Sequence, residues 1–165
     1  IDLADALALH HMRLIYGGEN IGLMGLMANQ VLEKGGQAVG VIPEFLAQKD
    51  LAHTSLTEIH KVRSMHERKK LMYDLSDAFI ALPGGFGTLD EFLEIVTWAQ
   101  IGHHHKPIAV LNTQGFYDHL LNHFEVAKNN GFLSEAHQNI VEVYSEVNEW
   151  IDRLKKLSER NLPGV

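Results

Sequence analysis

The feature that most constrains this chain is a regular alternation of short apolar runs with longer segments of helical spacing. The sequence predicts six strands, at residues 13–16, 38–42, 57–62, 78–82, 107–111 and 140–144. It predicts helices at residues 2–9, 22–34, 64–76, 88–101, 116–130 and 147–157. Because such alternation covers both faces of a parallel sheet with helices, we predict an α/β fold, a doubly wound, mostly parallel, Rossmann-like sheet. No linker or repeat interrupts the pattern, so we expect a single nucleotide-binding domain over residues 1–165.

The start of the chain predicts one element more. Residues 2–9 have the spacing of a helix that leads into a strand, and in a doubly wound sheet such a helix crosses over from an earlier strand. We therefore expect the natural protein to carry another strand and turn before Ile1, so that this chain lacks the first strand of its sheet. The turn after a first strand often holds phosphate, and part of the site is expected there.

The net charge and the absence of cysteine indicate what kind of partner and compartment to expect. The formal net charge is −7 and the pI is about 5.8, so an acidic surface disfavours nucleic acid, while a few aimed donors can still bind a single nucleotide. The sequence contains no cysteine, which removes disulfides and thiolate metal sites and suits a reducing compartment. No apolar run has the length of a membrane span and no secretory signal opens the chain. We expect a soluble cytoplasmic protein with no membrane partner.

A glycine-rich turn follows the predicted strand at residues 78–82. Gly84, Gly85 and Gly87 precede a helix expected to begin near Thr88. Glycine lets a phosphate approach the backbone closely, and the free amides at a helix N-terminus favour negative charge. The alternative is a strand-to-helix turn that only needs positive φ. With three glycines in four residues at the start of a helix, we favour a phosphate site.

Glu91 has two interpretations. The spacing from Thr88 to Glu91 matches a capping box, in which the glutamate bonds back to the first amide of its helix. Alternatively, Glu91 shares a helical stripe with Ile95 and Trp98, where partial desolvation would raise the pKa of its carboxyl group. It also lies one turn from the predicted phosphate site, within reach of a bound sugar.

Arg68 interrupts an apolar stripe formed by Met65, Met72 and Leu75. An arginine in that position either extends to solvent or points at an anion in a cleft. Because the helix leads directly to the strand before the glycine-rich turn, we favour the anion. We assign Glu67 only a capping role, as the last residue of a second capping box.

The remaining candidates carry weaker signals. The turn at Gly17 and Gly18 precedes the predicted helix at residues 22–34, so it could face a nucleotide. Lys69 is a possible second cation, although a solvated lysine is more common. The three histidines within residues 102–107 fall in a loop, which we interpret as solvent-exposed or as a subunit contact. We expect no metal site.

Two segments together resemble the LOG (Lonely Guy) family of cytokinin riboside 5′-monophosphate phosphoribohydrolases. The family signature Pro-Gly-Gly-x-Gly-Thr-x-x-Glu is matched at residues 83–91, and the upstream Met-His-x-Arg-Lys is matched at residues 65–69. Residues 22–25, 40–43 and 97–100 are also similar to that family. The resemblance runs from about Leu3 to about Leu154, which is nearly the whole chain.

The resemblance implies a Rossmann-like homodimer that hydrolyses N6-substituted adenosine monophosphates, and AMP itself, to free base and ribose 5-phosphate. It implies that Arg68 and Glu91 are catalytic. The nucleotide-contacting positions that it implies are Lys69, Gly84, Gly85, Gly87 and Thr88, with the turn at Gly17 and Gly18 nearby. Many bacterial members carry the label "lysine decarboxylase-like". We reject that activity here, because no lysine is placed to hold pyridoxal phosphate, and we expect no cofactor.

One residue departs from the family pattern, and one other function remains open. Glu19 stands where the family usually has glycine or alanine. Because a carboxylate weakens phosphate binding, we expect Glu19 to point away or the substrate to differ. The alternative function is a non-catalytic nucleotide-binding sensor or carrier module, in which Glu91 would only cap its helix.

Overall fold

The computed structural model describes residues 1–49 and 51–161 and divides the chain into two compact units, Ile1–Ser76 and Asp77–Val165. Each unit holds a three-stranded, fully parallel sheet with helices between the strands. The predicted α/β class with parallel strands is therefore confirmed. A single sheet and a single domain over residues 1–165 stay predictions, and residues 50 and 162–165 lie outside the described part of the chain.

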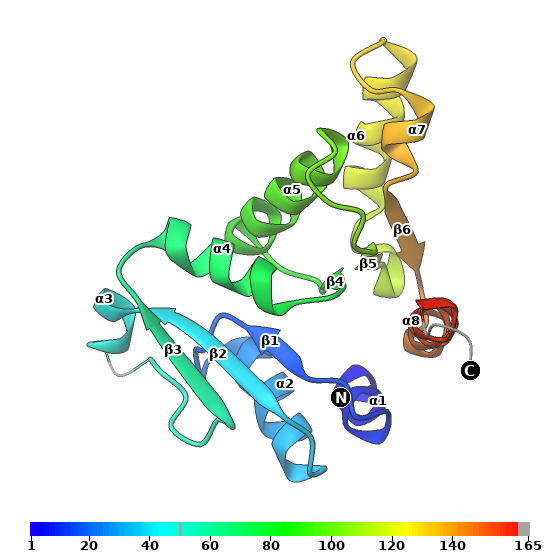
Figure 1. Cartoon of the computed structure of the whole chain (residues 1–165). Coiled ribbons are helices and arrows are strands. Elements are labelled where there is room, and N and C mark those ends of the chain that lie inside the picture. The colour runs from blue at the N-terminus through cyan, green and yellow to red at the C-terminus, as the bar shows by residue number, and fades with distance from the viewer. Residues whose placement is uncertain (50, 162–165) are drawn as a thin grey trace. The chain divides into compact units, whose positions relative to one another are not determined.

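The sheet of the first unit has the strand order β1-β2-β3 (Figure 1). Its strands are β1 (Leu14–Tyr16), β2 (Ala38–Pro43) and β3 (Glu58–Val62). Every residue of β2 is buried, because this central strand has a neighbour on each side. That position explains the continuous apolar run at residues 38–42, and the more polar β3 lies at an edge.

Helices cover the two faces of this first sheet. They are α1 (Asp2–Leu9), α2 (Gly22–Glu33), the short α3 (Glu44–Ala47) and α4 (Met65–Leu75). Figure 1 shows α2 on one face of the strands and α4 on the other. The α2 helix buries Met27, Ala28 and Val31, which lie on one helical face as the spacing predicts. The buried residues of α4 are Arg68 and Tyr73, so a charged side chain lies on its inner face.

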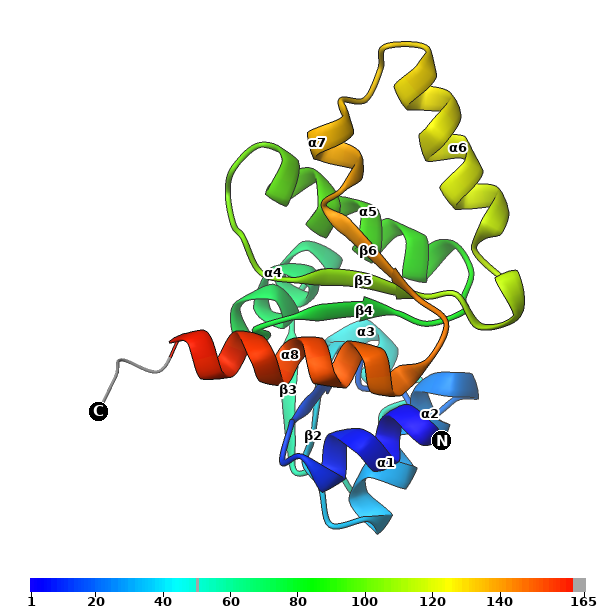
Figure 2. The same cartoon turned by 90° about the vertical axis from the view of Figure 1, so that its right-hand side faces the viewer.

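The second unit repeats this pattern with the strand order β4-β5-β6. Its strands are β4 (Phe79–Ala81), β5 (Ile108–Leu111) and β6 (Val141–Tyr144). Its helices are α5 (Phe86–Gln100), the 3₁₀ turn η1 (Thr113–Gly115), α6 (Asp118–Asn129), α7 (Glu135–Gln138) and α8 (Val147–Asn161). Figure 2 shows α5 and α6 on one side of this sheet and α8 on the other. All of β5 is buried, as expected for its central place.

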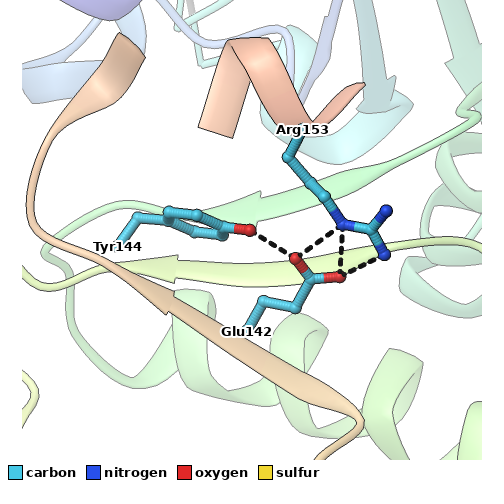
Figure 3. Close-up of polar contacts among 3 residues, drawn as sticks. All are labelled: Glu142, Tyr144 and Arg153. Carbon is cyan, nitrogen blue, oxygen red and sulfur yellow. Dashed lines mark hydrogen bonds and ion pairs between the residues drawn. The ribbon is translucent and has the colours of Figure 1, made fainter. Parts of the chain in front are cut away.

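A polar cluster attaches α8 to the edge strand β6 (Figure 3). Arg153 of α8 donates from Nε to Oε2 of Glu142 at 3.1 Å and from Nη2 to Oε1 at 3.2 Å, while the Tyr144 hydroxyl donates to the same carboxylate. Burial, and then its bond to Glu142, raise the pKa of Tyr144 to about 12. Beside this cluster Trp150 and Ile151 are each only 2% exposed, so the helix is held by apolar packing as well.

All six predicted strands and all six predicted helices are present, and most of their bounds agree within two residues. The sequence did not predict α3, α7 or η1. The largest consequence lies in α5, which begins at Phe86, two residues before the predicted start. No helix in the described ranges is long and apolar enough to cross a membrane.

Candidate functional site

The first glycine turn, at Gly17 and Gly18, follows β1 and is held against β2. Gly18 has φ +79°, and a Cβ there would lie 3.2 Å from Cβ of Ile42 and 3.3 Å from N of Val41. Its carbonyl accepts a bond of 2.9 Å from the backbone N–H of His53. Both the left-handed backbone and the close packing therefore require glycine at position 18.

Gly17 is required for another reason, because it makes room for Arg68. A Cβ at position 17 would lie 1.8 Å from Nη2 of Arg68 and 3.3 Å from Sδ of Met24. The structure therefore brings together two of the predicted site residues. Arg68 is only 6% exposed, so the interpretation that it extends to solvent is wrong. Its predicted apolar companions Met65 and Met72 are half-buried.

Glu19 is the carboxylate that faces Arg68. Its Oε2 lies 3.9 Å from Nη2 of Arg68, and Glu19 itself is 9% exposed. Beside this pair, the Tyr16 hydroxyl is buried and makes no hydrogen bond within the described residues. Burial raises the pKa of Tyr16, and the charge of Glu19 raises it further. The sequence singled out Glu19 as a departure but did not identify its partner, although a buried arginine needs a counter-charge.

Lys69 follows Arg68 on α4 and is half-buried. The start of this helix is capped as predicted, because the Ser64 Oγ accepts from the Glu67 N–H at 3.1 Å. The Glu67 carboxylate in turn accepts from the Arg63 N–H at 2.8 Å. Glu67 is thus a capping residue, while the role of Lys69 stays a prediction.

The second glycine turn, residues 83–87, lies between β4 and α5. The N-cap of α5 is Gly85, which offers no side-chain cap to the first amides of the helix. Glu91 therefore lies in the second turn of α5, and the capping-box interpretation of Thr88 and Glu91 is wrong. The Thr88 side chain instead packs over Gly84, where a Cβ would lie 2.2 Å from Oγ1 of Thr88.

Gly85 and Gly87 have no comparable internal explanation. Both are exposed, and a Cβ at either position would have no heavy atom within 4 Å. None of Gly84, Gly85 and Gly87 has positive φ, so the alternative that this turn only needs glycine for positive φ is wrong. The helix α5 has fifteen residues, and no side chain caps its N-terminus. The exposed backbone there can bind a phosphate at close range.

Glu91 lies on the stripe of α5 that the spacing predicts. It is half-buried, as is Trp98 on the same stripe, while Ile95 is 8% exposed. The predicted site residues thus form two groups. Gly17, Gly18, Arg68 and Lys69 belong to the unit Ile1–Ser76, and Gly84, Gly85, Gly87, Thr88 and Glu91 belong to the unit Asp77–Val165.

The loop at residues 102–107 corrects one expectation. His103 and His105 are exposed, but His104 is buried with 6% exposure. Its Nε2 lies 3.0 Å from the Ile95 carbonyl and its Nδ1 accepts from the Lys106 N–H at 3.1 Å. His104 is therefore a packed residue that ties the loop to α5. Within residues 1–49 and 51–161, no group of three or more His, Asp or Glu side chains could hold a metal ion.

Comparison with known proteins gives consistent matches. The protein family described as "possible lysine decarboxylase" matches residues 24–154. A cytokinin riboside 5′-monophosphate phosphoribohydrolase of Rhodococcoides fascians is 49% identical, over 88% of this chain and 74% of that protein. A phosphoribohydrolase of the same name from Arabidopsis thaliana is 42% identical, over 96% of this chain and 74% of that protein.

Solved structures with a similar fold carry other names. A molybdenum cofactor binding protein of Rippkaea orientalis has a TM-score of 0.70 at 22% identity, over 94% of this chain and 83% of its own. The molybdenum cofactor carrier protein of Chlamydomonas reinhardtii has a TM-score of 0.68 at 23% identity, over 96% and 84%. At such identities the likeness concerns the fold alone.

Proposed function

The chain belongs to the family described as possible lysine decarboxylase, the LOG family, in which curated relatives are cytokinin riboside 5′-monophosphate phosphoribohydrolases, and from this premise we propose its activity and its site. It hydrolyses the N-glycosidic bond of an adenosine 5′-monophosphate, with or without an N6 substituent. The products are a free base and ribose 5-phosphate. The relative that is 49% identical over 88% of this chain is the observation that carries this assignment.

The substrate phosphate binds at the second glycine turn. The open backbone at Gly85 and Gly87 and the uncapped amides of α5 support this placement, because both favour an anion at close range. Thr88 lies in the first turn of α5 and adds a hydroxyl there. A helix N-terminus of this kind binds the phosphate in substrate and product alike, so it contributes to affinity more than to turnover.

Arg68 and Glu91 act on the sugar. In the reaction the bond between C1′ and the base nitrogen breaks, and its electron pair leaves with the base. The oxygen of a water bonds to C1′ and keeps one proton as the new hydroxyl group, while the other proton of that water ends on the base, which leaves as a neutral molecule. Glu91 takes the proton of the attacking water or stabilises the cationic sugar, which is the role that carboxylates have in glycosidases. Arg68 fixes the phosphate or ribose, so that binding energy is converted into orientation. Lys69, Gly17 and Gly18 contact the nucleotide.

The first test is turnover of AMP and of N6-isopentenyl-AMP, followed as release of free base. We expect Glu91→Gln to lower kcat by about a thousandfold, as for loss of a general base, without loss of nucleotide affinity. Arg68→Ala should lower kcat and weaken binding as well. Asp90→Asn, the same charge change one residue earlier on α5, should leave both values unchanged.

Two outcomes would reject parts of this assignment. If Glu91→Gln releases ribose 5-phosphate at the normal rate, Glu91 has no part in the chemistry. If the wild-type protein binds AMP and returns it intact, the chain is a binding or carrier module instead of a hydrolase.

We also infer that the protein is a cytoplasmic homodimer. Exposed apolar side chains on α2 support a subunit contact, since Leu23 is 52% and Leu26 is 66% exposed at positions three residues apart. The absence of cysteine from the sequence is consistent with a reducing compartment. Light scattering on the purified protein tests the dimer, and a monomeric mass would reject it. Cell fractionation tests the compartment.

A further inference from the structure

A buried ion pair lies within the first unit, between the first glycine turn and α4. Glu19 is 9% exposed and Arg68 is 6% exposed, and their nearest charged atoms, Oε2 and Nη2, are 3.9 Å apart. Charged side chains at this depth are costly to desolvate unless they are paired. The two charges therefore depend on one another, and removal of either changes the environment of the other.

The backbone holds Glu19 firmly in this place. Residue 19 forms an isolated antiparallel bridge with Ala52. On one side of it the Gly18 carbonyl accepts from the His53 N–H at 2.9 Å, and on the other side the Asn20 N–H donates to the Leu51 carbonyl at 2.9 Å. Since the backbone is hydrogen-bonded on both sides of residue 19, the Cα of Glu19 is held in place, and this limits where its carboxylate can lie.

Arg68 is held from the opposite side. Its backbone lies in α4, and its Nη1 lies 3.8 Å from Sδ of Met65 in the preceding turn. Its Nη2 fills the space that a side chain at Gly17 would need. The guanidinium is therefore confined between its own helix, the glycine turn and the Glu19 carboxylate.

We propose that Glu19 is the positioning residue for Arg68, and that its charge also limits how strongly Arg68 binds phosphate. The carboxylate orients the guanidinium under Gly17 and compensates its positive charge. Arg68 then serves to orient the sugar, while the second glycine turn carries most of the phosphate affinity. This proposal rests on the proposed function, because it assumes that Arg68 faces the nucleotide.

Charge and reach can be separated experimentally with two variants. Glu19→Gln keeps the size of the side chain and removes its charge, so Arg68 loses the negative charge of this neighbour. Glu19→Asp keeps the charge and shortens the side chain by one methylene, so the orientation of Arg68 is lost first. A residue needed only for folding would not produce opposite changes in turnover and phosphate affinity.

The experiment measures kcat and KM for AMP, and the binding of inorganic phosphate by calorimetry. For Glu19→Gln we expect kcat to fall about tenfold and phosphate to bind about threefold to tenfold more tightly, since loss of this negative charge makes the surroundings of Arg68 more favourable for an anion. For Glu19→Asp, which keeps the charge and displaces it, we expect kcat to fall and phosphate affinity to stay unchanged. The matched control is Asp74→Asn, which removes one carboxylate from the exposed Lys70–Asp74 pair on α4 and should change neither value.

Several results would overturn the proposal. A kcat for Glu19→Gln within twofold of wild type would exclude positioning, and weaker or unchanged phosphate binding would exclude charge compensation. If Glu19→Gln does not fold, an unchanged kcat for Glu19→Asp excludes positioning by itself. If the wild type turns over no nucleotide, the proposed function fails, and the phosphate affinities of the two variants still decide whether Glu19 compensates Arg68.

Discussion

In the first glycine turn, both glycines are explained by the atoms of the protein around them. Gly17 leaves room for the Arg68 guanidinium, and Gly18 has φ +79° against β2. In the second turn, Gly85 and Gly87 have neither positive φ nor any neighbour that a Cβ would meet within 4 Å. The glycines of the first turn therefore make room for neighbouring parts of the protein, whereas the backbone at Gly85 and Gly87 is exposed. Internal packing is therefore enough to require glycine in the first turn, whereas the free space at Gly85 and Gly87 favours a ligand at the second.

Gly17→Ala has the largest expected effect, and it tests whether Gly17 is needed to make room for Arg68. The new Cβ would overlap Nη2 of Arg68, so the guanidinium must leave its position beside Glu19 or the turn must move. We expect kcat/KM for AMP to fall about a hundredfold, because small displacements of an orienting group cost that much. Overpacking should also lower the free energy of unfolding by about 1–3 kcal/mol, measured by urea denaturation.

Gly35→Ala separates the two effects of that substitution. Gly35 has φ +76°, and a Cβ there would have no heavy atom within 4 Å, so alanine is strained by about 1 kcal/mol without touching any site residue. It should lose stability and keep its activity. If Gly35→Ala loses activity as Gly17→Ala does, the loss follows from general destabilisation, and the assigned purpose of Gly17 is wrong.

Gly87→Ala tests whether the second glycine turn binds phosphate. Gly87 lies in the first turn of α5 with open space around it, so alanine should stabilise the protein by about 0.5–1 kcal/mol through helix propensity. A methyl group on that surface should weaken AMP binding about tenfold, because phosphate can no longer reach the backbone closely. Thermal denaturation and calorimetry measure the two changes. Unchanged AMP affinity in a stabilised variant would show that phosphate does not bind at this turn.

The two turns also show what local sequence could and could not predict. Strand-to-helix turns at residues 17–18 and 83–87 follow from periodicity and glycine spacing, and so does the buried central place of β2 and β5. The start of α5 was predicted two residues late, because Thr88 is a favoured N-cap residue whereas the helix in fact begins after Gly85. That small shift decides the position of Glu91, which is too far along the helix to cap it.

Pairings across the fold were beyond local patterns. The contact of Glu19 with Arg68 depends on how α4 packs against the sheet β1-β2-β3, and no spacing along the sequence encodes it. The helices α3 and α7 have only four residues each, which is too short for a helical period to be recognised. His104 was expected in an exposed loop because its neighbours are polar, but its ring reaches back to the Ile95 carbonyl.

The smallest expected effect is a loss of stability on acidification. It arises at His104, which follows the C-terminal end of α5, the helix that begins at the second glycine turn. Burial lowers the pKa of His104 below the ordinary value of 6.5, and the charge of Lys106 lowers it further. Its Nδ1 accepts from the Lys106 N–H, so the neutral ring is the form that fits. Since the unfolded chain binds a proton more readily, stability from this site is fully present above pH 6.5 and is lost as the pH falls toward the folded-state pKa.

We expect Tm to fall from about pH 7 to about pH 5 in the wild type and to fall less in His104→Gln. The control His119→Gln, which changes an exposed residue of α6, should keep the wild-type dependence of Tm on pH. Equal slopes for all three proteins would remove His104 as a source of acid sensitivity.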